Sequence, residues 1–490
     1  MTGELPRPDP RRWKALAVTL AAGFMTMLDV SIVNVALPSI QRGTGASAGT
    51  VQWVVSGYVL TFGLVLVSGG RLGDALGRRR MFLVALAGFV TMSAFAGAAP
   101  TAGLLVIARL LQGCAAGLLT PQNTGLIQVL FRGAERGRAF GLFGATVGVS
   151  TAVGPVLGGL IIALFGPEEG WRWVFYVNIP VGVLAFVLAM RLVPAARGRR
   201  IRLRSEIDFV GIVLLGLAVL GLLLPLVEAQ EGGLRRLWWL FGVAVLFGVA
   251  FVWWEMRAVR AGRAPLMDIG LFASTPGYAS GAALGAIYFC GFAGIWLVFA
   301  LFFQQGLGYS ALESGLSVTP FAIGSAVSAA LAGRLVTRWG RRLTVAGLLL
   351  VVAGFAAVAL LAWLLPSGRM GLLAALPLLV SGIGGGMVIA PNTTLTLDCV
   401  PPAVAGVAGG ALQTAQRIGT AIGTAVLAGV FRATVPATGG RFSLALAITL
   451  ACAIGFILAA LVLALGELRA RRTPPSADQL PAVTAAAPSE

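Results

Sequence analysis

Fourteen apolar segments recur along this chain, and each is long enough to cross a lipid bilayer. The hydrocarbon core of a bilayer is about 30 Å thick, which about 20 helical residues span. Lipid offers no hydrogen-bond partners to the backbone, so spanning segments of this kind must be helical. The sequence therefore predicts an all-α integral membrane protein with 14 transmembrane helices, at residues 15–38, 50–69, 81–99, 102–122, 139–164, 173–193, 209–227, 237–255, 278–304, 314–336, 343–365, 370–394, 405–431 and 442–466.

The composition excludes an ordinary soluble domain, because 58% of the residues are hydrophobic and only 11% are charged. A net charge of +18 would suit nucleic acid in a soluble protein, but here the basic residues lie in short loops between the spans. We place 27 of the 36 lysines and arginines on the side of the two termini, which the positive-inside rule makes cytoplasmic. We expect a multi-pass protein of the inner (cytoplasmic) membrane, surrounded by lipid, with both termini in the cytoplasm and no nucleic-acid partner.

A basic turn between the second and third segments occurs twice. Residues 70–80 share six of eleven positions with residues 333–343, and Thr337 replaces Asp74 in the second copy. A second trace of the same repeat lies in the fourth and twelfth spans, where four residues recur after 269 positions: Gly113, Gly117, Asn123 and Thr124 match Gly382, Gly386, Asn392 and Thr393. The chain is therefore a duplicated membrane protein.

This duplication predicts two six-helix bundles, at 15–193 and 277–466, around a central two-helix segment at 194–276. We expect residues 467–490 to form a cytoplasmic tail. Two similar bundles related by an axis along the membrane normal are the plan of a transporter whose halves rock against each other.

Several motifs resemble the major facilitator superfamily. The turn with Gly70, Arg71, Asp74, Gly77 and Arg78 is similar to the signature loop of that superfamily. Within it, the fourteen-helix drug:proton antiporter branch is indicated by four further motifs: residues 28–38, Trp53 with Tyr58, residues 109–113 and residues 171–182. The fifth span is similar to a motif that marks exporters, through Gly144, Gly148, Gly154, Pro155, Gly158 and Gly159. The resemblance covers residues 15–466.

The resemblance implies a proton-coupled secondary transporter that exports hydrophobic or amphipathic compounds such as drugs or antibiotics. Its partners would be a small-molecule substrate, protons and membrane lipid, and we expect it to act as a monomer without a cofactor. In the family, the contact made by Asp74 holds one of the two alternating states. The arginines of this turn have a plainer alternative role, which is to fix the topology.

Asp29 is the one acidic residue that we place well inside a span, and the chain has no histidine. Intramembrane carboxylates usually mark ion or proton pathways. Arg109 lies at a similar predicted depth, so the two side chains could be neighbours, and the resemblance implies that Arg109 takes part in proton transfer. We expect Asp29 to face a cavity and to couple protons. The alternative is a purely structural ion pair.

Five residues are candidates for the substrate cavity: Asn34, Gln112, Phe292, Trp296 and Arg417. Gln112 follows Arg109 by three positions and so shares its helical face. Phe292 and Trp296 belong to an aromatic stretch that suits bulky planar drugs, although packing against lipid explains such residues equally well. The alternative for Arg417 is bonding between helices. For the glycines of the fifth span the choice is between a hinge with a seal and ordinary close packing.

Other classes of function fit less well. The chain lacks a G-x-x-x-x-G-K-[ST] loop, so ATP is not the expected energy source. Four scattered cysteines and the absence of histidine predict neither a metal site nor an enzyme. A dedicated exporter of an endogenous metabolite or antibiotic is the alternative within the same class. In another class, the alternative is a channel or a membrane sensor.

Overall fold

The computed structural model describes residues 10–194, 208–229, 232–263, 265–364 and 369–470. Fourteen helices in these ranges are long and apolar enough to cross a membrane, and the described residues contain no strand. The predicted all-α membrane fold is confirmed. Parts of the predicted central segment, at 195–207, 230–231 and 264, lie outside the described residues, as does the tail from residue 471.

The first half of the fold consists of six spans. They are formed by α1 (Arg12–Thr44), α2 (Ala48–Leu76), α3 (Arg78–Ala98), α4 (Ala102–Leu130), α5 (Gly133–Phe165), and α6 (Gly170–Tyr176) with α7 (Asn178–Leu192). Two spans lie between the halves, and they are formed by α9 (Phe209–Val227) and α11 (Trp239–Arg260), with the short α10 (Gly233–Arg236) joining them.

The second half begins after α12 (Gly270–Ser274). Its spans are α13 (Tyr278–Phe292) with α14 (Ile295–Leu301) and a π-helical turn (Phe302–Gly306), α15 (Ala311–Trp339), α16 (Arg341–Leu364), α17 (Met370–Leu373) with α18 (Ala375–Thr396), α19 (Ala405–Ala437) after a 3-10 turn (Pro402–Val404), and α20 (Phe442–Ala470). The predicted tail at 467–490 therefore starts within the last turn of α20.

The basic turn differs from its prediction, because most of it is helical. Residues 70–76 form the last two turns of α2, and Gly77 alone separates α2 from α3. Gly77 has φ +96°, a conformation that side-chain-bearing residues rarely adopt. The same arrangement recurs at Gly340, between α15 and α16. A helix continues past its apolar run because the membrane interface still favours internal backbone hydrogen bonds.

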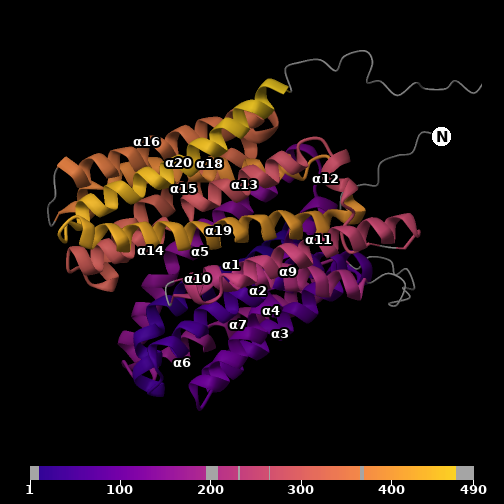
Figure 1. Cartoon of the computed structure of the whole chain (residues 1–490). Coiled ribbons are helices and arrows are strands. Elements are labelled where there is room, and N and C mark those ends of the chain that lie inside the picture. The colour runs from indigo at the N-terminus through magenta and orange to yellow at the C-terminus, as the bar shows by residue number, and fades with distance from the viewer. Residues whose placement is uncertain (1–9, 195–207, 230–231, 264, 365–368, 471–490) are drawn as a thin grey trace, which may run out of the picture.

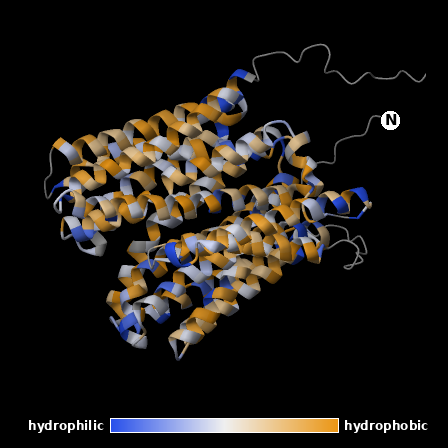
Figure 2. Cartoon of the chain, in the orientation of Figure 1, coloured by the Kyte–Doolittle hydropathy of each residue, from blue (hydrophilic) through white to orange (hydrophobic). Residues whose placement is uncertain are grey.

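Figure 1 shows the two halves as two groups of helices, α1–α7 in indigo to purple and α13–α20 in pink through orange to yellow. They meet along two seams, one between α2 and α19 and the other between α5 and α15. Hydrophilic residues gather toward the helix ends (Figure 2). Both described ends of the chain, at α1 and α20, lie on one side of the molecule, which we call the terminal side (Figure 1).

The central pair, α9 and α11, packs beside the seam between α2 and α19. Its contacts there are apolar: Val219 of α9 lies in one cluster with Leu60 of α2 and Ala421 of α19. Hydrogen bonds join α9 to α11, and α11 to the linker that follows it. Asp208 accepts a hydrogen bond from the Trp254 indole at 2.8 Å, and Glu255 accepts from the backbone N–H groups of residues 266 and 267.

Candidate functional site

The acidic residue of the first span lies inside the first half of the protein. Asp29 on α1 has no exposed surface, and Arg109 on α4 is 1% exposed. Arg109 Nη1 donates to Asp29 Oδ2 at 2.5 Å, which makes a buried ion pair. The structure thus brings Asp29 and Arg109 together. A buried pair of this kind persists only where further hydrogen bonds satisfy both charges.

Those further bonds come from α4, α7 and α2. Gln112 Nε2 and Asn178 Nδ2 each donate to Asp29 Oδ1 at 3.1 Å. Arg109 donates through Nε to the carbonyl oxygen of Val54 at 2.9 Å and through Nη1 to Gln112 Oε1 at 2.8 Å. The four side chains Asp29, Arg109, Gln112 and Asn178 form one closed network, which we call the Asp29 cluster.

Two predicted site residues are enclosed in the conformation described here. Asp29 was expected to face a cavity, but it is enclosed between α1, α4 and α7. Gln112 was expected to line the substrate cavity, but it is fully buried as a partner of Asp29 and Arg109. The physical reason is the same for both: a membrane carboxylate is stabilised by as many donors as can reach it.

Asn178 was not assigned a role from the sequence, although it lies in a motif that carried the family resemblance. It stands at the break between α6 and α7 and is 1% exposed. Its amide also donates to Ser93 Oγ at 3.1 Å, and Ser93 in turn donates to the carbonyl oxygen of Phe175 at 2.9 Å. Its position, as a polar asparagine at the start of an apolar span, is the sequence feature that could have marked it as a site residue.

A second buried acid, Glu255, also lies within a helix. Glu255, which the sequence placed at the end of a span, lies five residues before the end of α11 and has no exposed surface. Its carboxylate is held by backbone N–H groups on the terminal side, far along the chain from the Asp29 cluster.

The terminal side is closed by contacts of the signature turn with the second half. Asp74 accepts hydrogen bonds from the backbone N–H groups of Gly406 and Val407, at 3.2 and 3.0 Å. These N–H groups belong to the first turn of α19, where the helix dipole favours a negative charge. Arg78 makes an ion pair with Asp74 at 2.5 Å and donates to the carbonyl oxygen of Pro402 at 2.9 Å.

The remaining residues of the turn support this contact. Gly70 packs directly on the α19 backbone, because a Cβ on Gly406 would lie 2.6 Å from the Gly70 carbonyl oxygen. Arg71 lies half-buried in the last turns of α2. Further hydrogen bonds across the halves join Gln128 to Leu397, Arg136 to Asp398 and Gln413 to Thr124.

The glycines of α5 separate into two groups by what they touch. Gly144 and Gly148 face the second half: a Cβ on Gly144 would lie 3.1 Å from Ala390 Cβ of α18, and one on Gly148 would lie 3.3 Å from the Ala326 nitrogen of α15. Gly158 faces α1, at 3.0 Å from Ile32 Cγ1, and a Cβ on Gly154 would overlap Ser31. A Cβ on Gly159 would meet no atom within 4 Å. Pro155 belongs to α5, but its side chain lies outside the described residues.

Two glycines that the sequence motif did not include make the closest approach of α5 to α15. A Cβ on Gly141 would lie 2.8 Å from the carbonyl oxygen of Ala329, and one on Gly137 would lie 2.6 Å from the carbonyl oxygen of Gly333. The seam between α5 and α15 is therefore a contact of backbone on backbone at the terminal side.

The other predicted cavity residues do not form one group. Asn34 is exposed on α1, while Arg417 is half-buried on α19 between the two halves. Phe292 and Trp296 lie in the second half, with ring centroids 5.5 Å apart, and Trp296 packs edge-on against Phe321 of α15 at 4.5 Å. They are half-buried against the core of that half.

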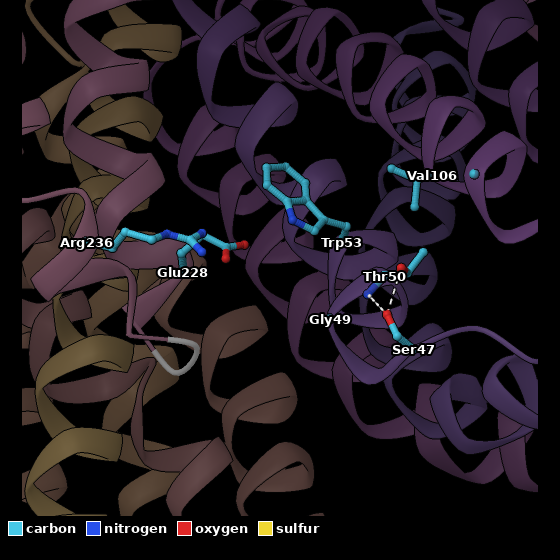
Figure 3. A pocket seen from close by; sticks show the side chains of 8 residues that line it. Ser47, Gly49, Thr50, Trp53, Val106, Glu228 and Arg236 are labelled. Carbon is cyan, nitrogen blue, oxygen red and sulfur yellow. Dashed lines mark hydrogen bonds between the residues drawn. The ribbon is translucent and has the colours of Figure 1, made fainter.

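A pocket of about 480 Å³ opens on the side opposite the termini. Its wall comes from α2 and α4 on one side and from the connection between α9 and α11 on the other, where Glu228 and Arg236 lie across from Trp53 (Figure 3). Its polar lining is completed by Thr50 and by Ser47, which caps the start of α2 by accepting a hydrogen bond from the Thr50 backbone N–H at 3.3 Å.

The chain is similar to known proteins in sequence and in fold. The chain is 39% identical to the puromycin resistance protein pur8 of Streptomyces alboniger, over 86% of this chain and 82% of that protein. It is 35% identical to the tetracenomycin C resistance and export protein of Streptomyces glaucescens, over 85% of this chain and 75% of that protein. A crystal structure of a human organic anion transporter has the same fold, with a TM-score of 0.68 at 16% identity, covering 93% of this chain and all of the other.

The family model matches a continuous stretch of the chain that contains the Asp29 cluster and the closing contact of Asp74. This stretch runs from residue 19 to residue 424, and its description is the Major Facilitator Superfamily. With two halves, a signature turn seated on α19 and relatives that share more than a third of their aligned residues, this chain belongs to the Major Facilitator Superfamily.

Proposed function

We propose that this protein is a proton-coupled exporter of hydrophobic or amphipathic antibiotics across the cytoplasmic membrane. The observation that carries the proposal is a buried carboxylate, Asp29, in a chain that is similar to antibiotic resistance and export proteins. The protein would act as a monomer with both termini in the cytoplasm. The conformation described here then has its cytoplasmic side closed.

In this proposal the Asp29 cluster is the proton site. A proton on Asp29 removes the negative charge that holds Arg109. The hydrogen bonds that Gln112 and Asn178 donate to Asp29 on α1 then also weaken, because their acceptor is no longer charged. Ser31, two residues further along α1, donates to the carbonyl oxygen of Ser150 on α5 at 3.2 Å. Because α5 packs on α15 of the second half, a shift of α1 reaches the seam that must open and close.

Transport driven by an imposed pH gradient tests this function. We expect purified protein in liposomes to accumulate puromycin or tetracenomycin C against its concentration gradient when the gradient is present, and to stop when a protonophore is added. Uptake should saturate with substrate. Passive equilibration without accumulation would instead favour a channel. Accumulation of one compound only, from a broad panel, would favour the dedicated exporter.

The contact of Asp74 with α19 provides the test of the gate. Asp74→Asn keeps the size of the side chain but removes the charge that faces Arg78 and the start of α19. A charge at a helix N-terminus contributes about 0.3–1 kcal/mol, and up to about 2 kcal/mol when partly buried. We expect the closed terminal side to become less populated and the turnover rate to fall several-fold, while substrate affinity stays unchanged.

The measurement is efflux at matched protein level, together with labelling of a cysteine placed at Gln413 in a cysteine-free background. Asp398→Asn serves as the control, because Asp398 also pairs across the halves but its side chain is 55% exposed. Exposed pairs contribute little. Wild-type turnover and labelling in Asp74→Asn would contradict the gating role.

A further inference from the structure

Arg417 occupies the middle of the membrane between the two halves. It lies twelve residues after the start of α19, about 18 Å along the helix axis. Its guanidinium carbon is 4.4 Å from the centre of the Phe62 ring on α2, and Nη2 is 3.9 Å from the Met27 sulfur on α1. Both contacts come from the other half of the protein. No described carboxylate forms an ion pair with it.

Two fully buried arginines of the fold are arranged differently. Arg109 is paired with Asp29, and Arg341 is paired with Glu467 at 2.5 Å and bonded to Asn392. Each of these pairs is completed within one half. Arg417 keeps its positive charge, because an arginine does not lose its proton in proteins. Its described partners, a thioether and an aromatic face, leave most of its N–H donors available.

The charges near the membrane centre do not balance. Asp29 and Arg109 neutralise each other inside the first half, so Arg417 contributes an uncompensated positive charge between the halves. An intramembrane charge without a partner is costly and marks a functional site by default. A cationic ligand would be repelled there. An anion would supply the missing partner, through the paired N–H bonds that a guanidinium makes with a carboxylate.

The surroundings of Arg417 favour an aromatic ligand. Phe62 stacks with Tyr58 at 6.1 Å between ring centroids, and Tyr58 lies under Arg109 at 4.2 Å. This row of rings on α2 offers a flat apolar surface beside the guanidinium. Asn34 lies two helical turns beyond Met27 on the same face of α1, and its exposed amide adds a polar contact on the open side.

From this arrangement we propose that Arg417 binds the acidic group of the exported compound, and that the preferred substrates are aromatic amphiphiles carrying a carboxylate or an acidic phenol. The inference rests on the proposed export function and names its substrate class. An anionic lipid headgroup offers the same chemistry, so the test separates the two sources.

The test uses three probes that share one ring system and differ in charge: anthracene carboxylate, anthracene methanol and anthracene methylamine. Their binding to the purified protein is followed by fluorescence. We expect the carboxylate to bind at least about tenfold more tightly than the other two. Arg417→Gln should remove this preference and leave the binding of the alcohol unchanged. Arg417→Lys should retain part of it, because it keeps the charge but loses the planar pair of donors.

Arg338→Gln is the matched control, since it removes an exposed arginine from α15 and should leave the preference intact. Size-exclusion and thermal melting profiles check that the variants fold. If the wild-type protein binds the three probes equally, or binds none, the inference is wrong. The same holds if Arg417→Gln weakens all three equally.

Transport assays then separate this inference from the function on which it rests. In liposomes of phosphatidylcholine alone, gradient-driven export that favours the carboxylate supports a small-molecule anion at Arg417. A preference that is absent with native lipid, and that addition of phosphatidylglycerol abolishes whenever it is seen, assigns the site to an anionic lipid headgroup and overturns the inference. Export without any preference for the anion overturns it as well, while the proposed export function stands. Absence of gradient-driven transport of every compound contradicts the function itself.

Discussion

The Asp29→Asn variant is expected to lose proton-driven efflux completely while it still exchanges substrate down a concentration gradient. Asparagine keeps the shape of the side chain but carries neither a charge nor an exchangeable acidic proton. The proton would then have no binding site in the Asp29 cluster, and substrate movement could not be linked to it. The measurement is efflux of a fluorescent substrate from liposomes with an imposed pH gradient, at matched protein level.

A structural effect has to be separated from this one, because the substitution leaves Arg109 buried without its partner. Breaking a buried pair from one side costs about 3–5 kcal/mol. The double variant Asp29→Asn with Arg109→Gln removes both charges and should regain most of the thermal stability. We expect it to remain uncoupled. If gradient-driven efflux returns with stability in the double variant, the pair is structural and the proton site lies elsewhere, with Glu255 as the next buried acid to examine.

Placing a leucine at Gly141 should trap the transporter with its terminal side open. A Cβ at this position would already lie 2.8 Å from the Gly333 Cα atom, so a larger side chain forces α5 away from α15. Overpacking costs about 1–3 kcal/mol. Here that cost applies only to the closed state, in which the two helices touch. A bias of this size changes the ratio of the two states by about 5–150-fold.

Two readouts test this expectation. Turnover should fall by a similar factor, and a cysteine at Gln413 should become more reactive toward a membrane-impermeant reagent from the terminal side. Gly159→Leu is the matched control on the same helix, because a Cβ there has no neighbour within 4 Å. Equal turnover in the two leucine variants would show that the closeness of α5 and α15 is ordinary packing without a role in the cycle.

The number and type of the helices could be predicted because the bilayer imposes both. Each apolar run of about 20 residues must be a helix, so fourteen runs predicted fourteen spans. The ends of the helices could be predicted less well. The α2 helix continues through Asp74 to Leu76, beyond its apolar run, because polar residues at the interface remain compatible with helix.

The direction in which Asp29 points could not be predicted. Its depth in the membrane matched that of Arg109, and the contact between them follows from that. However, in a membrane the lipid-facing and protein-facing surfaces of a helix are both apolar, so the periodicity of α1 does not say which face packs on α4. For the same reason, the glycines of α5 indicated that another helix packs closely on α5 but did not indicate which helix. Only the structure separates Gly148, which faces α15, from Gly158, which faces α1.

The apolar contact of α9 with the two halves has a mechanical consequence. Among the described residues, no hydrogen bond or ion pair joins α9 to α2 or to α19, and the contact consists of side chains such as Leu60, Val219 and Ala421. Apolar groups gain little by leaving lipid for an apolar protein surface. We therefore expect α9 to shift along the seam when α2 and α19 change their tilt, and to keep lipid tails out of the gap between them.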